Sequence, residues 1–224
     1  LKAVLFDIDG TLFNSDGVHF EVFQKVLAEY SFNRGRAIDE AFFLQRISGR
    51  SNAAIVADLF PQFTAEQGAA FAEYKEACFR ERAASLLPSL VTPGLHDLLS
   101  WIDAHGVAKA AVTNAPRKNA EQMLSCIDRL EWFDTVVIGD ECAAAKPNPE
   151  PYLEAMRRLR VAAGECLAFE DSPSGAAAAV GAGVLTYGLL TSQSEGALLD
   201  AGCHAVIRDF EDAALWRELR SAVD

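Results

Sequence analysis

The chain has 224 residues, half of them hydrophobic, with a formal net charge of −12 and a pI near 4.8. This length can bury a core in one domain or in a domain plus an insert, and the acidic balance argues against nucleic acid or an anionic membrane as partner. No apolar run has the length that spans a bilayer, and the five scattered cysteines suit reduced thiols, so we expect a cytoplasmic protein.

The first predicted element is a strand over residues 2–7, and it ends on two carboxylates. Asp7 and Asp9 are two residues apart, so on an extended backbone their side chains point the same way and converge at the strand's carboxyl end. Gly10 then allows a tight turn around that point. Two carboxylates this close favour one anion and one proton carrier, the pairing of a nucleophile with an acid. A solvated turn rich in aspartate has the same pattern, so this segment alone leaves both alternatives open.

The next segment, residues 16–85, is predicted to be entirely helical. Apolar residues recur at helical spacing between Val18 and Tyr30, and Thr64 with Gln67 forms a capping box before a helix that runs to about residue 84. About a hundred residues separate the first strand from the second, far more than a usual crossover between parallel strands. We therefore predict a helical cap of residues 16–85, inserted into a core domain of residues 1–15 and 86–224.

The remainder of the chain alternates short β-like runs with helical stretches. This alternation is typical of a parallel sheet with helices on both faces. The predicted fold class is therefore α/β, a doubly wound parallel sheet with an inserted, small, all-helical cap. We expect strands at 109–113, 135–139, 167–170, 184–190 and 204–207, and helices at about 95–105, 117–127, 150–160, 174–182, 194–200 and 211–222.

Three of these later strands are followed by polar residues, as the first strand is. In open α/β sheets ligands bind outside the carboxyl ends of the strands, so these residues are expected to share one crevice with Asp7 and Asp9. They are Thr113 and Asn114 after the second strand, Lys146 before a proline beyond the third, and Glu170 and Asp171 at the end of the fourth.

The motifs, taken in order, resemble those of the haloacid dehalogenase superfamily. They are DxDGT at residues 7–11, a threonine at a strand end, Lys-Pro, and Glu-Asp-Ser at residues 170–172. More narrowly, the chain is similar to the sugar-phosphate phosphatases and the β-phosphoglucomutase branch, over essentially its whole length. The resemblance implies a Rossmann-like core, a small phosphorylated metabolite as substrate, Mg²⁺ as cofactor and an aspartyl-phosphate intermediate. We also expect a monomer.

The resemblance assigns a role to each polar strand end. Asp7 is the predicted nucleophile, and Asp9 is the acid that protonates the leaving oxygen and then the base that activates water. Lys146 is expected to stabilise the transition state and to hold Asp7 anionic. Thr113 is expected to donate a hydrogen bond to a phosphoryl oxygen. Asn114 either donates another or caps the helix at 117–127.

A carboxylate that attacks a phosphate dianion needs a cation between the two charges. Asp7, the main-chain carbonyl of Asp9, and Asp171 offer the hard oxygens that suit Mg²⁺. Glu170 is either a further ligand, as in the mutase branch, or an acceptor for metal-bound water. Capping of the helix at 174–182 is the structural alternative for this pair, and Ser172 can do that equally well.

Two places in the cap bear on substrate binding. Gly49 and Arg50 belong to a loop between helical segments that is placed to hang over the cleft, where Arg50 would grip substrate hydroxyls or a second phosphate. A solvated loop arginine is the alternative. His19 stands at the spacing from Asp7 at which the β-phosphoglucomutase branch has a histidine that faces the substrate, and simple packing is its alternative.

Three functions fit these residues. A Mg²⁺-dependent phosphomonoester hydrolase comes first, a phosphosugar mutase second, and a non-enzymatic binding protein on the same fold third. Every predicted catalytic position keeps its functional group, which argues against the binding protein. Thr11 and Ser48 match the phosphatases, because mutases often have an aliphatic residue at the first position and a lysine at the second. His19 favours the mutase.

Overall fold

The computed structural model describes residues 1–221 and has a parallel sheet of six strands at its centre. The strand order is β3-β2-β1-β4-β5-β6. Phe6 in β1 pairs with Ala111 on one side and Phe169 on the other, so three strand ends lie level at the middle of the sheet. The strands are β1 (Ala3–Phe6), β2 (Ala108–Thr113), β3 (Thr135–Ile138), β4 (Cys166–Glu170), β5 (Leu185–Leu189) and β6 (Ala205–Ile207).

Helices cover both faces of this sheet, because alternate residues of each strand point to opposite faces. Val4 and Phe6 of β1 pack with buried residues of α5 (Leu95–Ala104), α6 (Arg117–Ser125) and α10 (Ala213–Ser221). Ala3 and Leu5 pack with α7 (Glu150–Leu159) and α8 (Pro173–Gly181) on the other face. The short α9 (Glu195–Asp200) packs against α8 through Leu198. The strands are apolar throughout because both faces are buried.

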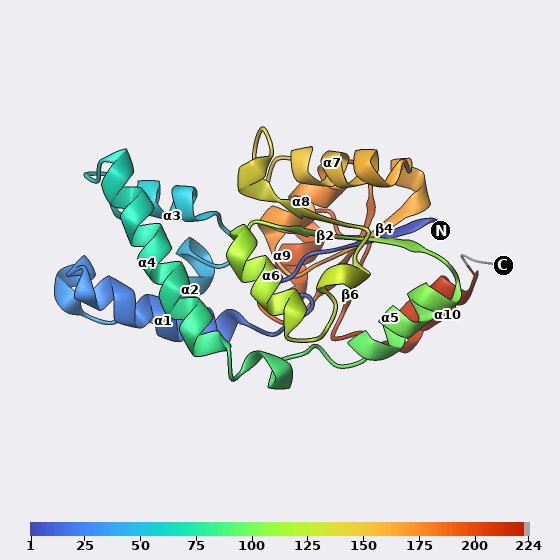
Figure 1. Ribbon diagram of the computed structural model, residues 1–224, viewed down its shortest axis with the longest axis horizontal. Helices are drawn as coiled ribbons and strands as arrows, with labels where there is room; N and C mark the ends of the chain where they lie inside the picture. Colours follow the sequence, from blue (N-terminus) through green and yellow to red (C-terminus); the bar gives the residue numbers. More distant parts are fainter. Residues whose placement is uncertain (222–224) are drawn as a thin grey trace.

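Four of the α-helices between β1 and β2 form a separate group to the left of the sheet, whereas α5 packs on the sheet itself (Figure 1). They are α1 (Asp16–Glu29), α2 (Glu40–Arg46), α3 (Asn52–Leu59) and α4 (Ala65–Ala83). Both hydrogen bonds of the capping box predicted at Thr64 and Gln67 are present at the start of α4. Phe23 and Phe43 from two of these helices pack in the buried interior, and a ring cluster around Phe60 and Phe71 packs at the far end.

The predicted fold class is confirmed, and the predicted strands and helices differ from the observed ones by no more than a few residues at each end. The last helix was expected to run to residue 222, which lies outside the described residues. The five cysteines carry free thiols, as their scattered positions predict. No helix within residues 1–221 is long and apolar enough to cross a membrane. The cap boundaries at 16 and 85 remain a prediction.

Candidate active site

The polar residues that follow the central strands converge on one pocket between the sheet and the helices α1–α4. β1 carries Asp7 into it, β2 carries Thr113, and the turns after β3 and β4 carry Lys146 and Asp171. β1 and β4 are neighbours although most of the chain separates them, so this point is where the strand order changes direction. Such a position is the expected ligand site of an open α/β sheet.

Lys146 is the centre of the buried part of this site. Its Nζ donates to Asp7 Oδ1 at 2.6 Å, to Glu170 Oε1 at 2.6 Å and to the Val112 carbonyl at 2.7 Å, and the residue is 5 % exposed. All three protons of the ammonium are therefore used, which fixes its position. Glu170 is fully buried, and its Oε1 also accepts from the Tyr152 hydroxyl at 2.5 Å.

The carboxylates around Lys146 outnumber it. Oxygens of Asp7, Glu170 and Asp171 lie within 4.8 Å of one another, and Glu170 Oε2 is buried without a hydrogen-bond partner. Burial and the charges of the neighbouring carboxylates both raise the pKa of Asp7. They also raise the pKa of Asp171 well above its usual value. Three hard oxygen donors with one lysine between them form a site that suits a divalent cation such as Mg²⁺.

Gly10 is required for this cluster to be compact. Its φ of +73° is strained for other residues, and a Cβ at this position would lie 2.0 Å from Asp171 Oδ2. The glycine of the DxDG motif therefore lets the turn after β1 approach the carboxylate that follows β4. Ser192 Oγ donates to the same Oδ2 at 2.5 Å.

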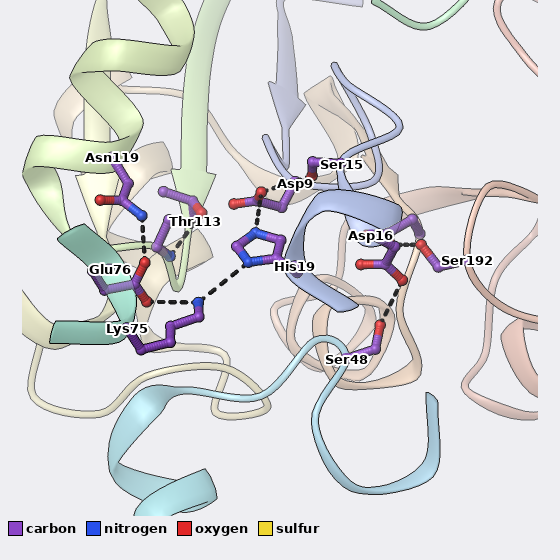
Figure 2. Close-up of polar contacts among 12 residues, drawn as sticks. Asp9, Ser15, Asp16, His19, Ser48, Lys75, Glu76, Thr113, Asn119 and Ser192 are labelled. Atoms are coloured by element: carbon purple, nitrogen blue, oxygen red, sulfur yellow. Dashed lines mark hydrogen bonds and ion pairs between the residues drawn. The ribbon is translucent and has the colours of Figure 1, made fainter. Parts of the chain in front are cut away.

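Asp9 lies on the cap side of the site and has a different environment (Figure 2). Its Oδ1 contacts Ser15 Oγ at 2.7 Å and His19 Nε2 at 2.9 Å, and His19 Nδ1 lies 3.2 Å from Lys75 Nζ. An ammonium can only donate, so Nδ1 accepts and the Nε2–H donates to Asp9. The His19 ring also stacks on the Phe79 ring, with 3.9 Å between the two ring centroids. His19 is thus bound to Asp9 as well as packed.

The pKa values of the two aspartates are displaced in opposite directions. For Asp9 burial acts to raise the pKa, but the interaction with His19 and the hydrogen bond of Ser15 lower it overall. For Asp7 burial prevails, although Lys146 opposes it. Lys146 also compensates Glu170, so its charge is shared between two carboxylates, and the expectation that it holds Asp7 anionic stays a prediction.

Thr113 and Asn114 have distinct partners at the end of β2. Thr113 Oγ1 accepts the N–H of Ala115 at 3.0 Å, which leaves its hydroxyl proton able to donate into the pocket.

The Asn114 amide makes two hydrogen bonds of 3.1 Å to the backbone of Lys146. Its Nδ2 donates to the Lys146 carbonyl, and its Oδ1 accepts from the Lys146 N–H. Asn114 therefore positions the lysine. The alternative that it caps the following helix is wrong, since Pro116 stands at that cap without a side-chain bond. Ser172, by contrast, does cap α8.

The cap loop reaches the pocket at Gly49 and Arg50. Gly49 has a φ of +71°, and a Cβ there would lie 2.6 Å from Ser172 Cβ, so the loop touches the core closely. Arg50 lines the pocket, yet its guanidinium donates to Asp58 Oδ2 at 2.8 Å and to the carbonyls of Arg46 and Ala54. Its substrate-binding role stays a prediction, and these bonds show that it has a structural role within the cap.

Sequence reasoning missed a group of polar residues on the cap side of the pocket. Glu76 accepts from Lys75 and Asn52 through Oε1 and from Asn119 through Oε2. One signal was available, because Lys75 is four residues from both Phe71 and Phe79 and so lies on the apolar face of its helix. No sequence signal marked Asn119, which lies in the core helix α6 and also accepts from Arg80 at 2.8 Å.

The sequence matches the family model of the haloacid dehalogenase-like hydrolases over residues 1–183. The chain belongs to this family, and the predicted resemblance is confirmed.

Curated relatives match nearly the whole chain. A phosphorylated carbohydrates phosphatase of Thermotoga maritima is 30% identical over 98% of this chain and 100% of its own length. A phosphoglycolate phosphatase of Rhodospirillum rubrum is 30% identical over 96% of this chain and 90% of its own. The crystal structure of a β-phosphoglucomutase from Clostridium difficile superposes with a TM-score of 0.82, covering 100% of this chain and 97% of that one. At 20% identity this last match shows the fold alone.

Proposed function

We propose that this protein is a Mg²⁺-dependent phosphomonoesterase that acts on small phosphorylated carbohydrates through an aspartyl-phosphate on Asp7. The observation that carries the proposal is the convergence of Asp7, Lys146 and Asp171 at one pocket, with Asp9 facing them from the cap side. The relative named as a phosphorylated carbohydrates phosphatase supports the substrate class.

Mg²⁺ would be held by Asp7 and Asp171, with the Asp9 carbonyl as a further oxygen and Glu170 either as ligand or as acceptor for bound water. The cation would compensate the carboxylates that Lys146 cannot and would draw the phosphoryl group toward Asp7. Thr113 would donate its hydroxyl proton to a phosphoryl oxygen. Lys146 would stabilise the negative charge that develops in the transition state.

The proposed roles require Asp7 to be ionised and Asp9 to carry a proton when the ester bond breaks. A bound cation and a bound phosphoryl group would produce these protonation states, because the cation lowers the pKa of Asp7 and the phosphoryl dianion raises the pKa of Asp9. Asp9 then gives its proton to the leaving oxygen and takes one from the attacking water. His19 and Ser15 orient the carboxylate for both transfers.

A phosphosugar mutase is the second candidate, and the bond between His19 and Asp9 is the observation that favours it. Ser48 argues for the hydrolase. Its hydroxyl donates to Asp16 Oδ2 at 2.9 Å, so at the position where mutases tend to have a lysine this chain has an uncharged side chain that bonds the cap loop to α1.

The test is a phosphate-release screen over small phosphorylated metabolites, run with Mg²⁺, with excess EDTA, and with Mg²⁺ restored. We expect release with Mg²⁺, loss with EDTA and recovery on restoration, with little recovery by Ca²⁺ because it prefers more ligands at longer distances. Isomerisation of glucose 1-phosphate primed by a bisphosphate is the parallel assay. Isomerisation faster than phosphate release would replace the hydrolase with the mutase.

A further inference from the structure

The wall of the pocket opposite the catalytic aspartates is organised around one buried carboxylate. Glu76 of α4 is 4 % exposed and lines the pocket together with Lys75, Asn52 and Asn119. Its Oε1 accepts from Lys75 Nζ at 2.9 Å and from Asn52 Nδ2 at 2.8 Å, and its Oε2 accepts from Asn119 Nδ2 at 2.5 Å. Figure 2 shows Glu76 between the lysine and the asparagine.

This carboxylate is an anion in the folded protein. Burial acts to raise the pKa of Glu76, but Lys75, His19 and the hydrogen bond from Asn52 lower it overall. Its three bonds come from donors alone, so each one favours the ionised form.

The positive charges of the pocket are all compensated. Among the described residues that line it, each lysine and arginine is within 3 Å of a carboxylate oxygen: Lys146 with Asp7 and Glu170, Lys75 with Glu76, and Arg50 with Asp58. Acidic residues are more numerous, since Asp7, Asp9, Asp16, Glu76 and Asp171 all line the same pocket. A divalent cation at Asp7 and Asp171 would serve the phosphoryl group that reacts.

This distribution of charge should discriminate between esters whose leaving portion is anionic and esters whose leaving portion is neutral. A second anionic group on the leaving portion would enter a wall that offers it no uncompensated cation and would face Glu76, and burial from water strengthens that repulsion. A hydroxyl both donates and accepts, so neutral hydroxyls can share the carboxylate of Glu76 and the amides of Asn52 and Asn119.

We infer that Glu76 is a specificity-determining residue that restricts the enzyme to phosphomonoesters whose leaving portion is a neutral polyhydroxy compound, and that it rejects esters bearing a second phosphate or a carboxylate. The inference rests on the proposed phosphatase function and adds the substrate class. Glu76 also joins the cap to the core through Asn119 on α6, so a purely structural role is the competing explanation.

The experiment compares kcat/KM for matched pairs of esters that differ in one anionic group. Glycerol 3-phosphate is paired with 3-phosphoglycerate, and glucose 6-phosphate with 6-phosphogluconate, with p-nitrophenyl phosphate as a reference. We expect the wild type to prefer the neutral member of each pair by about tenfold or more, because the anionic member places a like charge beside Glu76.

Glu76→Gln keeps the shape of the side chain and removes its charge. We expect it to reduce that preference by about fivefold or more, mainly by raising kcat/KM for the anionic esters as Lys75 becomes available to them. Glu81→Gln, on the same helix and exposed, is the matched control and should leave both ratios unchanged. Asn52→Lys adds a cation to the same wall and should also reduce the preference for the neutral esters. It tests the inference if Glu76→Gln does not fold.

Two results would overturn the inference. One is a wild type that accepts the anionic members as well as the neutral ones. The other is a folded Glu76→Gln enzyme that loses activity on both members, and on p-nitrophenyl phosphate, by one common factor, which is the signature of a brace between cap and core. Failure to release phosphate from any ester, p-nitrophenyl phosphate included, would instead overturn the phosphatase function on which the inference depends.

Discussion

The two sides of the pocket differ in their balance of charge. On the core side, the carboxylates of Asp7, Glu170 and Asp171 share the charge of Lys146, so negative charge is left over. On the cap side, Lys75 and Arg50 are each matched by an acid within the cap itself. In the proposed function, the excess of negative charge on the core side would attract a cation, which in turn would hold a phosphoryl group. The balance on the cap side makes a wall that a neutral molecule can contact.

We therefore assign the reaction to residues on the core side and the selection of substrate to residues on the cap side. Core residues follow the ends of strands whose register is set by the sheet, so their positions depend little on the cap. Cap residues lie on α1, α3 and α4, and their positions at the site depend on contacts with the core such as those of His19 with Asp9 and of Glu76 with Asn119. Variants on the core side are therefore expected to remove turnover, and variants on the cap side to change which ester is used.

The largest effect is expected for Asp7→Asn. The change keeps the size of the side chain and removes the attacking charge, so turnover should fall by more than about 10³-fold. The circular dichroism spectrum should stay that of the wild type, because an amide can still accept from Lys146. Rates are measured with purified protein and p-nitrophenyl phosphate. Retention of more than a few per cent of the wild-type rate would contradict the nucleophile assignment.

Asp9→Asn tests the residue where the two sides meet. A sugar phosphate needs the proton, so its hydrolysis should slow by about 10²-fold or more. p-Nitrophenyl phosphate has a good leaving group and should still phosphorylate Asp7, so a burst followed by a slow steady state is expected. Rapid quench with detection of hydroxylamine-sensitive phosphoprotein measures the burst. Equal slowing of both esters without a burst would assign Asp9 to another role.

The surplus of negative charge on the core side should appear in the pH dependence of stability. Burial and Glu170 raise the pKa of Asp7 from 3.8 to about 8, so the protonated form contributes stability that is present below pH 3.8 and lost as the pH rises through about 8. In EDTA the Tm should therefore fall by about 3 °C or more between pH 6 and 9. Saturating Mg²⁺ should remove most of this fall, because the ion binds the carboxylate form.

Asp7→Asn provides the control for that measurement, since it lacks the titrating group. Its Tm in EDTA should change less over the same interval. A wild-type Tm that falls by the same amount with and without Mg²⁺ would show that the fall comes from groups outside this cluster.

The smallest effect is expected on the cap side, for Arg50→Ala. Its guanidinium is bound to Asp58 and to two carbonyls within the cap, so loss of either partner should change substrate binding only modestly, although loss of Asp58 also releases Arg46. We expect the KM values of Arg50→Ala and Asp58→Ala to agree within about twofold for a sugar phosphate, with a Tm reduction of a few degrees in each. A KM rise confined to Arg50→Ala would show that this arginine contacts the substrate.

The sequence predicted the core side of the site better than the cap side. Asp7 and Asp171 follow apolar strands and Thr113 ends one. Parallel strand ends meet at one edge of a sheet, so local patterns were enough to predict that these residues lie together. The cap residues depend on how one helix is rotated and on which core helix it meets. The pairing of Glu76 with Asn119 joins residues 43 positions apart through two helices, and no local spacing encodes it.

The amino-acid pattern was enough to predict the order of strands and helices and a helical segment after the first strand, because burial imposes periods of 2.0 and 3.6 residues on the chain. The partners of the polar residues at the strand ends could be seen only in the folded structure. Asn114 binds the backbone of Lys146, Glu170 binds its ammonium, and Arg50 binds Asp58. The charge of a pocket depends on the distances between side chains that come from separate elements, and those distances arise only when the elements pack.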